Sequence, residues 1–361
     1  MRITDIETVL LRLPNVAEVS DGTQDAFIVR VHTDEGIVGI GESDSMPTVL
    51  KAAIDAPTSN SIGHGLRHLL VGQNPLAIEP LLKRMMDGTR YLGGSGLRLI
   101  AISGLEMALW DIAGKATGRS LSTLLGGAQR SRVPVMASLD RYNDTAKVSA
   151  RIAQALDARV SAVKVHEFDL DVIEAARRVA GLQIPFVADC NNAHTMADVQ
   201  VHLARWQALD LLFLEDPAWP PEALLEAPPF PRVTVGLGAD LGSAEQLAVY
   251  ARAPSVGVLQ PDICMIGGVS EARRAVALLA SLGVAIAPHT PFIGPAALAT
   301  LHILAAMKEV AYFAVIEAEP HMDMYGDSGF TRWQPDLSVP TGPGLGFDPD
   351  PAWLKRYGLD L

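Results

Sequence analysis

Residues 256–289 read VGVLQPDICMIGGVSEARRAVALLASLGVAIAPH, and this stretch decides the fold class. A short apolar run ends at Asp262, a segment with helical spacing (VSEARRAVALLASLG) follows, and a second apolar run ends at His289. Two short apolar runs separated by an amphipathic helix are typical of a βα unit, in which successive strands lie parallel.

The same unit repeats along the chain from about residue 132. The short apolar runs end at intervals of about 22 to 28 residues, the length of one βα unit. Eight of them follow one another: VPVMASL, SAVKVH, PFVAD, LLFLE, VTVGLG, VGVLQPD, VAIAPH and YFAVIE. Eight such units in series predict an α/β protein with a (β/α)8-type, TIM-like barrel rather than a doubly wound sheet. We expect this catalytic barrel domain to cover residues 126–324.

The first hundred residues follow a different pattern. RITDIETVLLRLP and AFIVRVHTDEGIVGIGES alternate like strands, with TDEG as a hairpin turn, and two helical patterns follow. This predicts a small N-terminal α+β domain over residues 1–125. The tail, residues 325–361, is rich in Pro and Gly, and we expect it to complete this small domain as an extended segment.

Composition excludes several classes of partner. The chain is 49% apolar and 19% charged, as in a globular protein, and its 29 Lys and Arg against 41 Asp and Glu give a net charge of −12. A field of that sign repels phosphate backbones and anionic lipids, so we expect neither nucleic acid nor a membrane as partner. No apolar run reaches about 18 residues, and the N-terminus lacks a basic segment of the secretory type. Cys190 and Cys264 lie far apart, which favours a reduced, cytoplasmic protein.

Polar residues follow many of the predicted barrel strands, where active sites of such barrels form. Lys164 and His166 lie two residues apart and therefore share one face of a strand, from which both can point into the barrel mouth. Lys164 lies within an apolar strand, so it needs an anionic partner if it is buried. His166 could instead lean over the rim beside Glu167.

Two pairs of residues end neighbouring strands. Asp189 and Glu215 can bring their carboxylates to one ion, and oxygen ligands of this kind suit Mg²⁺. Each alone would more often be a helix N-cap or a rim salt bridge. Asp262 and His289 can form a dyad in which the carboxylate fixes the tautomer of the imidazole and raises its basicity, although a structural hydrogen bond would look the same.

Several segments resemble the enolase superfamily, and more narrowly its mandelate racemase branch with its sugar-acid dehydratases. They are TDEGIVGIGES, ALWDIAGKATGRSLSTLLGG, VKVHE, LEDPAWPPE, QPDICMIGG and HTPFIGPAALATLHILAA, and they span most of the chain. The first two resemble the family's capping domain and its junction, so the resemblance makes the small N-terminal domain an α+β capping domain. The resemblance implies a Mg²⁺-dependent lyase that dehydrates an acid sugar, a mono- or diacid, by removing the α-proton and passing through an enediolate. A racemase, epimerase or cycloisomerase of a hydroxy acid is the alternative. The resemblance also implies a small carboxylate substrate and a homo-oligomer.

The resemblance assigns roles to residues at the strand ends. Asp189 and Glu215 would be metal ligands, and Lys164 would polarise the substrate carboxylate. The remaining assignments concern substrate contacts and proton transfer: Asn191 would hydrogen-bond nearby, His289 with Asp262 would be one acid/base, and Glu317 would donate to the enediolate oxygen.

One departure from the family concerns the acids and bases. Where the branch often has K-x-K, this chain has K-x-H, so His166 would be the second acid/base, and imidazole suits that role because it titrates near neutrality. The muconate-lactonizing branch uses a lysine base on strand six. Asp262 ends that strand here, which disfavours the branch.

The other departure lies in VTVGLGADLG, residues 233–242. Relatives usually read G-E-N here, and Ala239 stands in place of the glutamate. Asp240 is the expected third metal ligand if the strand end bulges, which Gly236 and Gly238 would permit. It could instead cap the helix that starts near Ser243. Without a third ligand, the barrel could be a metal-poor protein that only binds.

Overall fold

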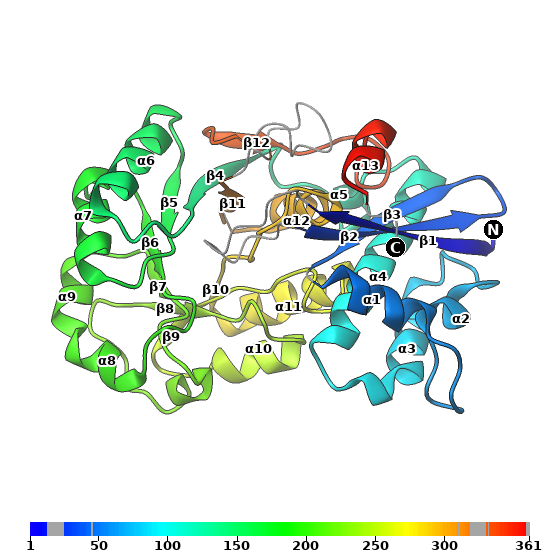
Figure 1. The fold of residues 1–361 in the computed structure, drawn as a ribbon, viewed down its shortest axis with the longest axis horizontal. Helices are drawn as coiled ribbons and strands as arrows, with labels where there is room; N and C mark the ends of the chain where they lie inside the picture. Colours follow the sequence, from blue (N-terminus) through cyan, green and yellow to red (C-terminus); the bar gives the residue numbers. More distant parts are fainter. Residues whose placement is uncertain (13–24, 45, 310, 318–329, 331, 359–361) are drawn as a thin grey trace.

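The computed structural model describes residues 1–12, 25–44, 46–309, 311–317, 330 and 332–358. Within them the chain forms two parts, an N-terminal cap built on an antiparallel sheet and a barrel of mostly parallel strands (Figure 1). The predicted fold class is therefore confirmed.

The cap consists of a three-stranded sheet and the helices that cover it. The strands β1 (Ile3–Arg12), β2 (Asp25–Thr33) and β3 (Val38–Ser43) pair antiparallel in that order. The helices are α1 (Pro47–Asp55), α2 (Leu66–Leu70), α3 (Ile78–Gly88), η1 (Arg90–Leu92), α4 (Leu97–Thr117) and α5 (Leu121–Leu124).

Helix α4 lies directly on β3, and two glycines make this contact possible. A Cβ atom at Gly39 would lie 2.2 Å from the carbonyl oxygen of Ala108, and one at Gly41 would lie 1.9 Å from that of Gly104. Only glycine permits so close an approach of helix and strand. The sequence IVGIGES thus brings the end of β3, including Glu42, against the long buried helix.

The barrel strands follow one another around a curved sheet, in the order β10-β9-β8-β7-β6-β5-β4-β11. Their bounds are β4 (Arg132–Leu139), β5 (Ala162–Val165), β6 (Phe186–Asp189), β7 (Phe213–Glu215), β8 (Val235–Leu237), β9 (Val256–Leu259), β10 (Ala285–Ile286) and β11 (Phe313–Ile316). Every pair of neighbours in this order is parallel. The eight predicted apolar runs correspond to these strands.

Helices connect the strands and cover the outside of the sheet (Figure 1). They are α6 (Thr145–Asp157), α7 (Leu170–Ala180), α8 (Met196–Val201), α9 (Leu203–Ala208), η2 (Pro221–Leu224), α10 (Ala244–Tyr250), α11 (Val269–Leu282) and α12 (Pro295–Ala306). Inside the barrel, one small cluster contains an apolar residue from each of six strands: Met136, Ala162, Val187, Phe213, Val258 and Ala314.

The gap between β10 and β11 is bridged by a side chain. Thr290 Oγ1 donates to the carbonyl oxygen of Ala314 and accepts from its amide, both at 2.9 Å. The hydroxyl thus satisfies both backbone groups of Ala314, as a neighbouring strand would. Thr290 directly follows His289, so this closure also fixes the chain beside a predicted catalytic residue.

The C-terminal segment contacts both parts of the protein, and part of it is helical. β12 (Asp336–Ser338) pairs antiparallel with β4 of the barrel, and α13 (Pro351–Tyr357) follows. An extended segment was expected here, but residues 351–357 are helical, because Pro351 occupies the first helical position and Asp350 accepts a hydrogen bond from Ala352 N as N-cap.

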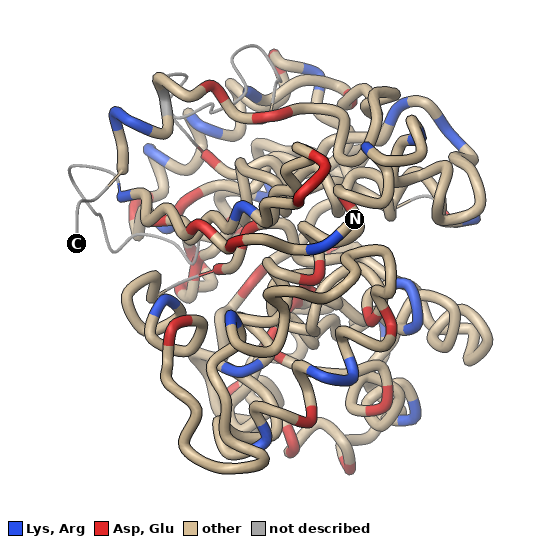
Figure 2. The backbone as a smooth tube through the Cα atoms, turned by 90° about the vertical axis from the view of Figure 1, so that its right-hand side faces the viewer, with Lys and Arg blue, Asp and Glu red and all other residues tan. Residues whose placement is uncertain are grey.

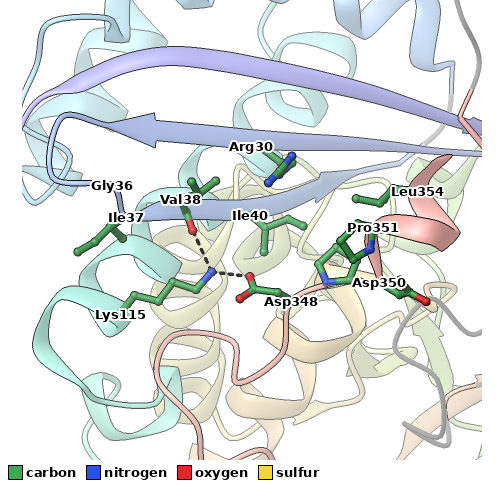
Figure 3. A pocket seen from close by; sticks show the side chains of 11 residues that line it. Arg30, Gly36, Ile37, Val38, Ile40, Lys115, Asp348, Asp350, Pro351 and Leu354 are labelled. Carbon is green, nitrogen blue, oxygen red and sulfur yellow. Dashed lines mark hydrogen bonds and ion pairs between the residues drawn. The ribbon is translucent and has the colours of Figure 1, made fainter.

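The cap and the C-terminal segment line an open pocket of about 630 Å³ (Figure 3). Lys115 Nζ points between the carbonyl oxygen of Val38, at 2.9 Å, and Asp348 Oδ1, at 2.6 Å. Close by, Leu345 N donates to Asp111 Oδ1 at 2.8 Å. None of the predicted site residues lines this pocket.

The distribution of charged residues, the apolar character of the helices and the state of the cysteines can be compared with the sequence analysis. Lys and Arg are interspersed with Asp and Glu along the backbone (Figure 2). None of the helices in the described part of the chain has the length and apolar character needed to cross a membrane. Cys190 and Cys264 are both buried and free.

Candidate active site

Three of the predicted site residues continue the rows of side chains that point into the barrel. Because side chains alternate along a strand, Lys164 shares the inner face of β5 with Ala162, Asp189 that of β6 with Val187, and Glu215 that of β7 with Phe213. These three polar side chains are almost fully buried. They therefore lie at the C-terminal end of the barrel, above its apolar filling.

Lys164 joins the two carboxylates. Its Nζ lies 3.0 Å from Asp189 Oδ2 and 2.9 Å from Glu215 Oε1, and Asp189 and Glu215 are direct register partners on β6 and β7. Burial and the neighbouring Asp189 raise the pKa of Glu215, against the opposing effect of the Lys164 ammonium. The anionic partners that a buried Lys164 requires are thus present.

His166 is oriented by a hydrogen bond of Nδ1 and lies beside Asp189. Nδ1 donates to the carbonyl oxygen of Leu139, and Nε2 lies 3.2 Å from Asp189 Oδ2. The ring is buried and does not lean over the rim. Glu167 instead turns away from it and accepts hydrogen bonds from the backbone amides of Tyr142 and Asn143. Lys164 and His166 therefore converge on the same carboxylate.

Two carboxylates of this site can hold a divalent cation. Glu215 Oε2 is buried and has no hydrogen-bond partner among the described residues, and an oxygen in that state is costly unless something binds it. With Asp189 it offers hard oxygen ligands, and Mg²⁺ is commonly held by one or two carboxylates together with water and substrate oxygens. No group of three His, Cys, Asp or Glu side chains within the described ranges is arranged to hold a metal ion. The residues therefore fit a cation with two protein ligands.

Asp240 is not placed as the expected third ligand. The inward position beside Glu215 on β8 is Gly236, and the chain turns away after Gly238, whose φ is 118°. Asp240 lies in this turn and is exposed, whereas Asp189 and Glu215 are 1% exposed. The pairing of β8 with β9 shifts register between Val235 and Gly236, but this irregularity does not turn Asp240 inward.

Asp240 is not the cap of the next helix either. The N-cap of α10 is Ser243, whose Oγ accepts from Gln246 N at 3.1 Å. The negative charge of Asp240 still affects the site electrostatically, because it helps to raise the pKa of Asp216.

Asp262 and His289 form the predicted pair. His289 Nδ1 lies 2.7 Å from Asp262 Oδ2, and the two residues also form a parallel bridge beyond β9 and β10. Asp262 is fully buried, and its Oδ1 accepts from the backbone amides of Cys264 at 2.7 Å and Met265 at 3.2 Å. The carboxylate is thus fixed, and it fixes the Nδ1–H tautomer of His289.

Asn191 supports the site through its backbone. It has a φ of 42°, and its amide donates to Asp189 Oδ1 at 2.9 Å. This hydrogen bond orients the Asp189 carboxylate from the side opposite to Lys164. A contact of the Asn191 side chain with substrate stays a prediction.

Glu317 is not brought to the cluster. It follows β11, on which Ala314 points inward and Val315 packs into the outer core, so alternation directs Glu317 outward. Its carboxylate accepts from the Tyr142 hydroxyl and forms an ion pair with Arg151 of α6. These contacts do not support the expected role of Glu317 as a donor to the enediolate oxygen.

Two carboxyl groups of the site region were missed by sequence reasoning. Burial, with the nearby carboxylates of Asp189, Glu215 and Asp240, raises the pKa of Asp216 well above its usual range. Its position directly after Glu215 in LEDP was the available signal. Glu42, at the end of a cap strand, is buried beside the barrel, and burial raises its pKa to about 8. No local pattern indicated that contact.

Comparisons with known proteins agree with this architecture. Residues 4–126 match the family model of the mandelate racemase / muconate lactonizing enzyme N-terminal domain, and residues 147–353 match that of the enolase C-terminal domain-like family. D-galactarolactone cycloisomerase of Agrobacterium fabrum is 30% identical over 99% of each chain. D-galactonate dehydratase of Verminephrobacter eiseniae is 32% identical over 77% of this chain and 74% of its own.

A solved structure also matches over the whole length. A member of the enolase superfamily from Polaromonas sp. JS666 superimposes with a TM-score of 0.86 at 28% identity, covering 100% of this chain and 98% of the other. The match includes cap and barrel together, in one arrangement.

Proposed function

Because the chain belongs to the mandelate racemase / muconate lactonizing enzyme family of the enolase superfamily, we propose that it is a dehydratase of an acid sugar. The observation that carries the proposal is the placement of two histidines around one pair of carboxylates. His166 follows β5 and contacts Asp189. His289 follows β10, so strands β6 to β9 lie between the two histidines in the sheet, and Asp262 orients it. A small carboxylate bound between them would meet a proton acceptor on one side and a donor on the other.

The proposed reaction uses these residues in two proton transfers. One histidine accepts the α-proton of the substrate, and the ammonium of Lys164 stabilises the negative charge that develops on the carboxylate. The other histidine donates a proton to the β-hydroxyl, which leaves as water. The resulting enol then becomes an α-keto acid. The stereochemistry of the substrate decides which histidine acts first.

Asp189 and Glu215 would hold Mg²⁺. The ion would supply positive charge beside the substrate carboxylate, additional to that of Lys164. This assignment is supported by the hard oxygen ligands and by the buried Oε2 of Glu215, which has no hydrogen-bond partner among the residues that the structure describes. A homo-oligomer and a cytoplasmic location stay predictions.

A cycloisomerase is the second candidate. It is favoured by the match to D-galactarolactone cycloisomerase, which extends over 99% of both chains. The same residues would serve, since the α-proton is removed in the same way but a ring C–O bond breaks in place of the bond to a β-hydroxyl. A racemase or epimerase would return the proton to the same carbon.

Turnover of two probes separates these candidates. Purified protein with Mg²⁺ is incubated with D-galactonate and, separately, with D-galactarolactone, and products are followed by NMR and mass spectrometry. Dehydration gives an α-keto acid that has lost one water. Cycloisomerisation gives a product of unchanged mass. A wider panel of acid sugars follows, and absence of turnover of every member by metal-saturated protein would overturn the proposal.

A further inference from the structure

A carboxylate of the cap is buried against the barrel next to the His289–Asp262 pair. Glu42 lies at the end of β3, is 3% exposed, and its Oε2 accepts from the backbone amide of Ala296 at 2.9 Å. Ala296 belongs to the first turn of α12, the helix that follows His289 in the chain.

The N-terminus of α12 depends on this contact. Its N-cap, Gly294, provides no side chain, and its first residue, Pro295, has no amide hydrogen. Ala297 N bonds to the carbonyl oxygen of Gly294, which leaves the Ala296 amide to the carboxylate of Glu42.

Gly294 shows how closely the carboxylate fits. A Cβ atom built there would lie 2.4 Å from Glu42 Oε2 and 2.7 Å from both Cδ and Oε1. A residue other than glycine would therefore displace the carboxylate. Glu42 and Gly294 thus form one contact between cap and barrel. This contact holds one end of the segment 290–294, and the hydrogen bond of Thr290 with Ala314 holds the other end.

The same residue also contacts the Asp262 side of the pair. Cys264 Sγ donates to the carbonyl oxygen of Glu42 at 3.4 Å, and the backbone amide of Cys264 donates to Asp262 Oδ1 at 2.7 Å. Glu42 is thus connected to Asp262 through Cys264, and to His289 through the segment between His289 and Ala296. Both connections start at this residue of the cap.

We propose that Glu42 is a positioning residue for the His289–Asp262 pair, so that the cap has to be docked for this acid/base to be correctly oriented. Glu42 would act through Ala296 and Cys264 and would touch neither substrate nor reacting atoms. The proposal rests on the proposed function for its kinetic consequence, but the orientation of His289 is observable without any substrate.

Glu106 provides a matched control, because it is a second buried cap carboxylate at the N-terminus of a barrel helix. It accepts hydrogen bonds from the amides of Val269 at 2.7 Å and Ser270 at 3.1 Å in α11. It also accepts one from the indole Nε1–H of Trp110 at 2.8 Å. Unlike Glu42, Glu106 forms a hydrogen bond with neither Cys264 nor α12 in the described part of the chain. Loss of Glu106 should therefore weaken docking while it leaves the connection from α12 to His289 in place.

The test compares four variants of the full chain. E42A removes the acceptor, E42Q retains an oxygen for Ala296 N, G294A displaces the carboxylate without altering it, and E106A is the control. The readout is the imidazole Nδ1 proton of His289 in ¹⁵N-histidine-labelled protein without substrate, assigned by its absence in H289N. We expect this signal to shift or broaden in E42A and G294A, and to stay in place in E42Q and E106A.

Kinetics provide the second readout. With the acid sugar that the wild type turns over, E42A and G294A should lose about tenfold in kcat with KM within about twofold, while E42Q recovers most of it. An unchanged His289 proton in folded E42A and G294A would overturn the proposal, and so would an E42Q protein as impaired as E42A. If the wild type turns over no acid sugar, the proposed function fails. The NMR comparison needs no substrate and still decides whether Glu42 positions His289.

Discussion

Lys164 contacts Asp189 and Glu215 at the centre of the site, and this arrangement followed from positions in the sequence. Residues two apart on a strand share a face, and parallel strands end at one edge, so the convergence of these side chains could be predicted. The position of Asp240 could not be predicted. It depends on the turn at Gly238, whose positive φ directs the following residues to solvent.

The metal assignment makes a prediction about these same residues. We expect D189N to weaken Mg²⁺ binding by at least about tenfold, because a neutral amide replaces one of two anionic ligands. D240N should leave the affinity within about twofold, since Asp240 is exposed and lies outside the pair. Isothermal titration with Mg²⁺ measures both. Equal losses in the two variants would restore Asp240 as a ligand.

The Asp262–His289 contact makes a second prediction. We expect D262N to lower kcat by about 10²- to 10⁴-fold, because an amide no longer fixes the Nδ1–H tautomer of His289 or stabilises its protonated form. KM should change little, since Asp262 is fully buried behind the imidazole. Steady-state kinetics at several pH values provide the measurement. A D262N protein with normal kcat would reduce the pair to a structural hydrogen bond.

At the scale of elements, the barrel strands were predictable and their closure was not. Each apolar run reads as a strand by itself, but the bridge from Thr290 to Ala314 joins positions whose pairing no periodicity reveals. The helix α13 was missed for a related reason. A Pro- and Gly-rich composition suggested an extended tail, while the local pair Asp350-Pro351 is a helix start.

His302 of α12 connects an element to the pH dependence of stability. It is fully buried, its Nε2 donates to the carbonyl oxygen of Leu345 at 3.1 Å, and burial lowers its pKa to about 4 from an ordinary 6.5. The unfolded chain therefore binds a proton that the folded protein does not between pH 6.5 and 4. The stability that neutral His302 contributes is complete above pH 6.5 and is lost as the pH falls through this window.

Substitution of His302 tests this linkage. In H302Q, whose amide can still donate to Leu345, we expect the fall in unfolding free energy between pH 6.5 and 4 to be less steep than in the wild type, by at most about 1.4 kcal/mol per pH unit. Chemical denaturation at a series of pH values gives the comparison. Parallel curves for the two proteins would show that His302 does not titrate on unfolding in this range.

At the scale of the whole molecule, composition and period predicted the two parts, but their contacts needed the structure. Glu42 reaches Ala296 and Glu106 reaches Val269, across separations of 254 and 163 residues. Such contacts join surfaces that are each incomplete alone, and neither the cap pattern nor the barrel pattern contains information about the other. The site belongs to the barrel, while its orientation depends on the cap.

The proposed function requires this protein to remove the α-proton of a bound carboxylate. This step is measured by ¹H NMR of an acid-sugar panel in D₂O with Mg²⁺, followed for wild type, H166N and H289N. We expect the wild type to lose the α-proton signal of at least one acid sugar, with solvent deuterium entering the substrate or product. We expect at least one of the two variants to lose this exchange. A metal-saturated wild type that exchanges no α-proton of any member would show that the protein does not catalyse this proton transfer.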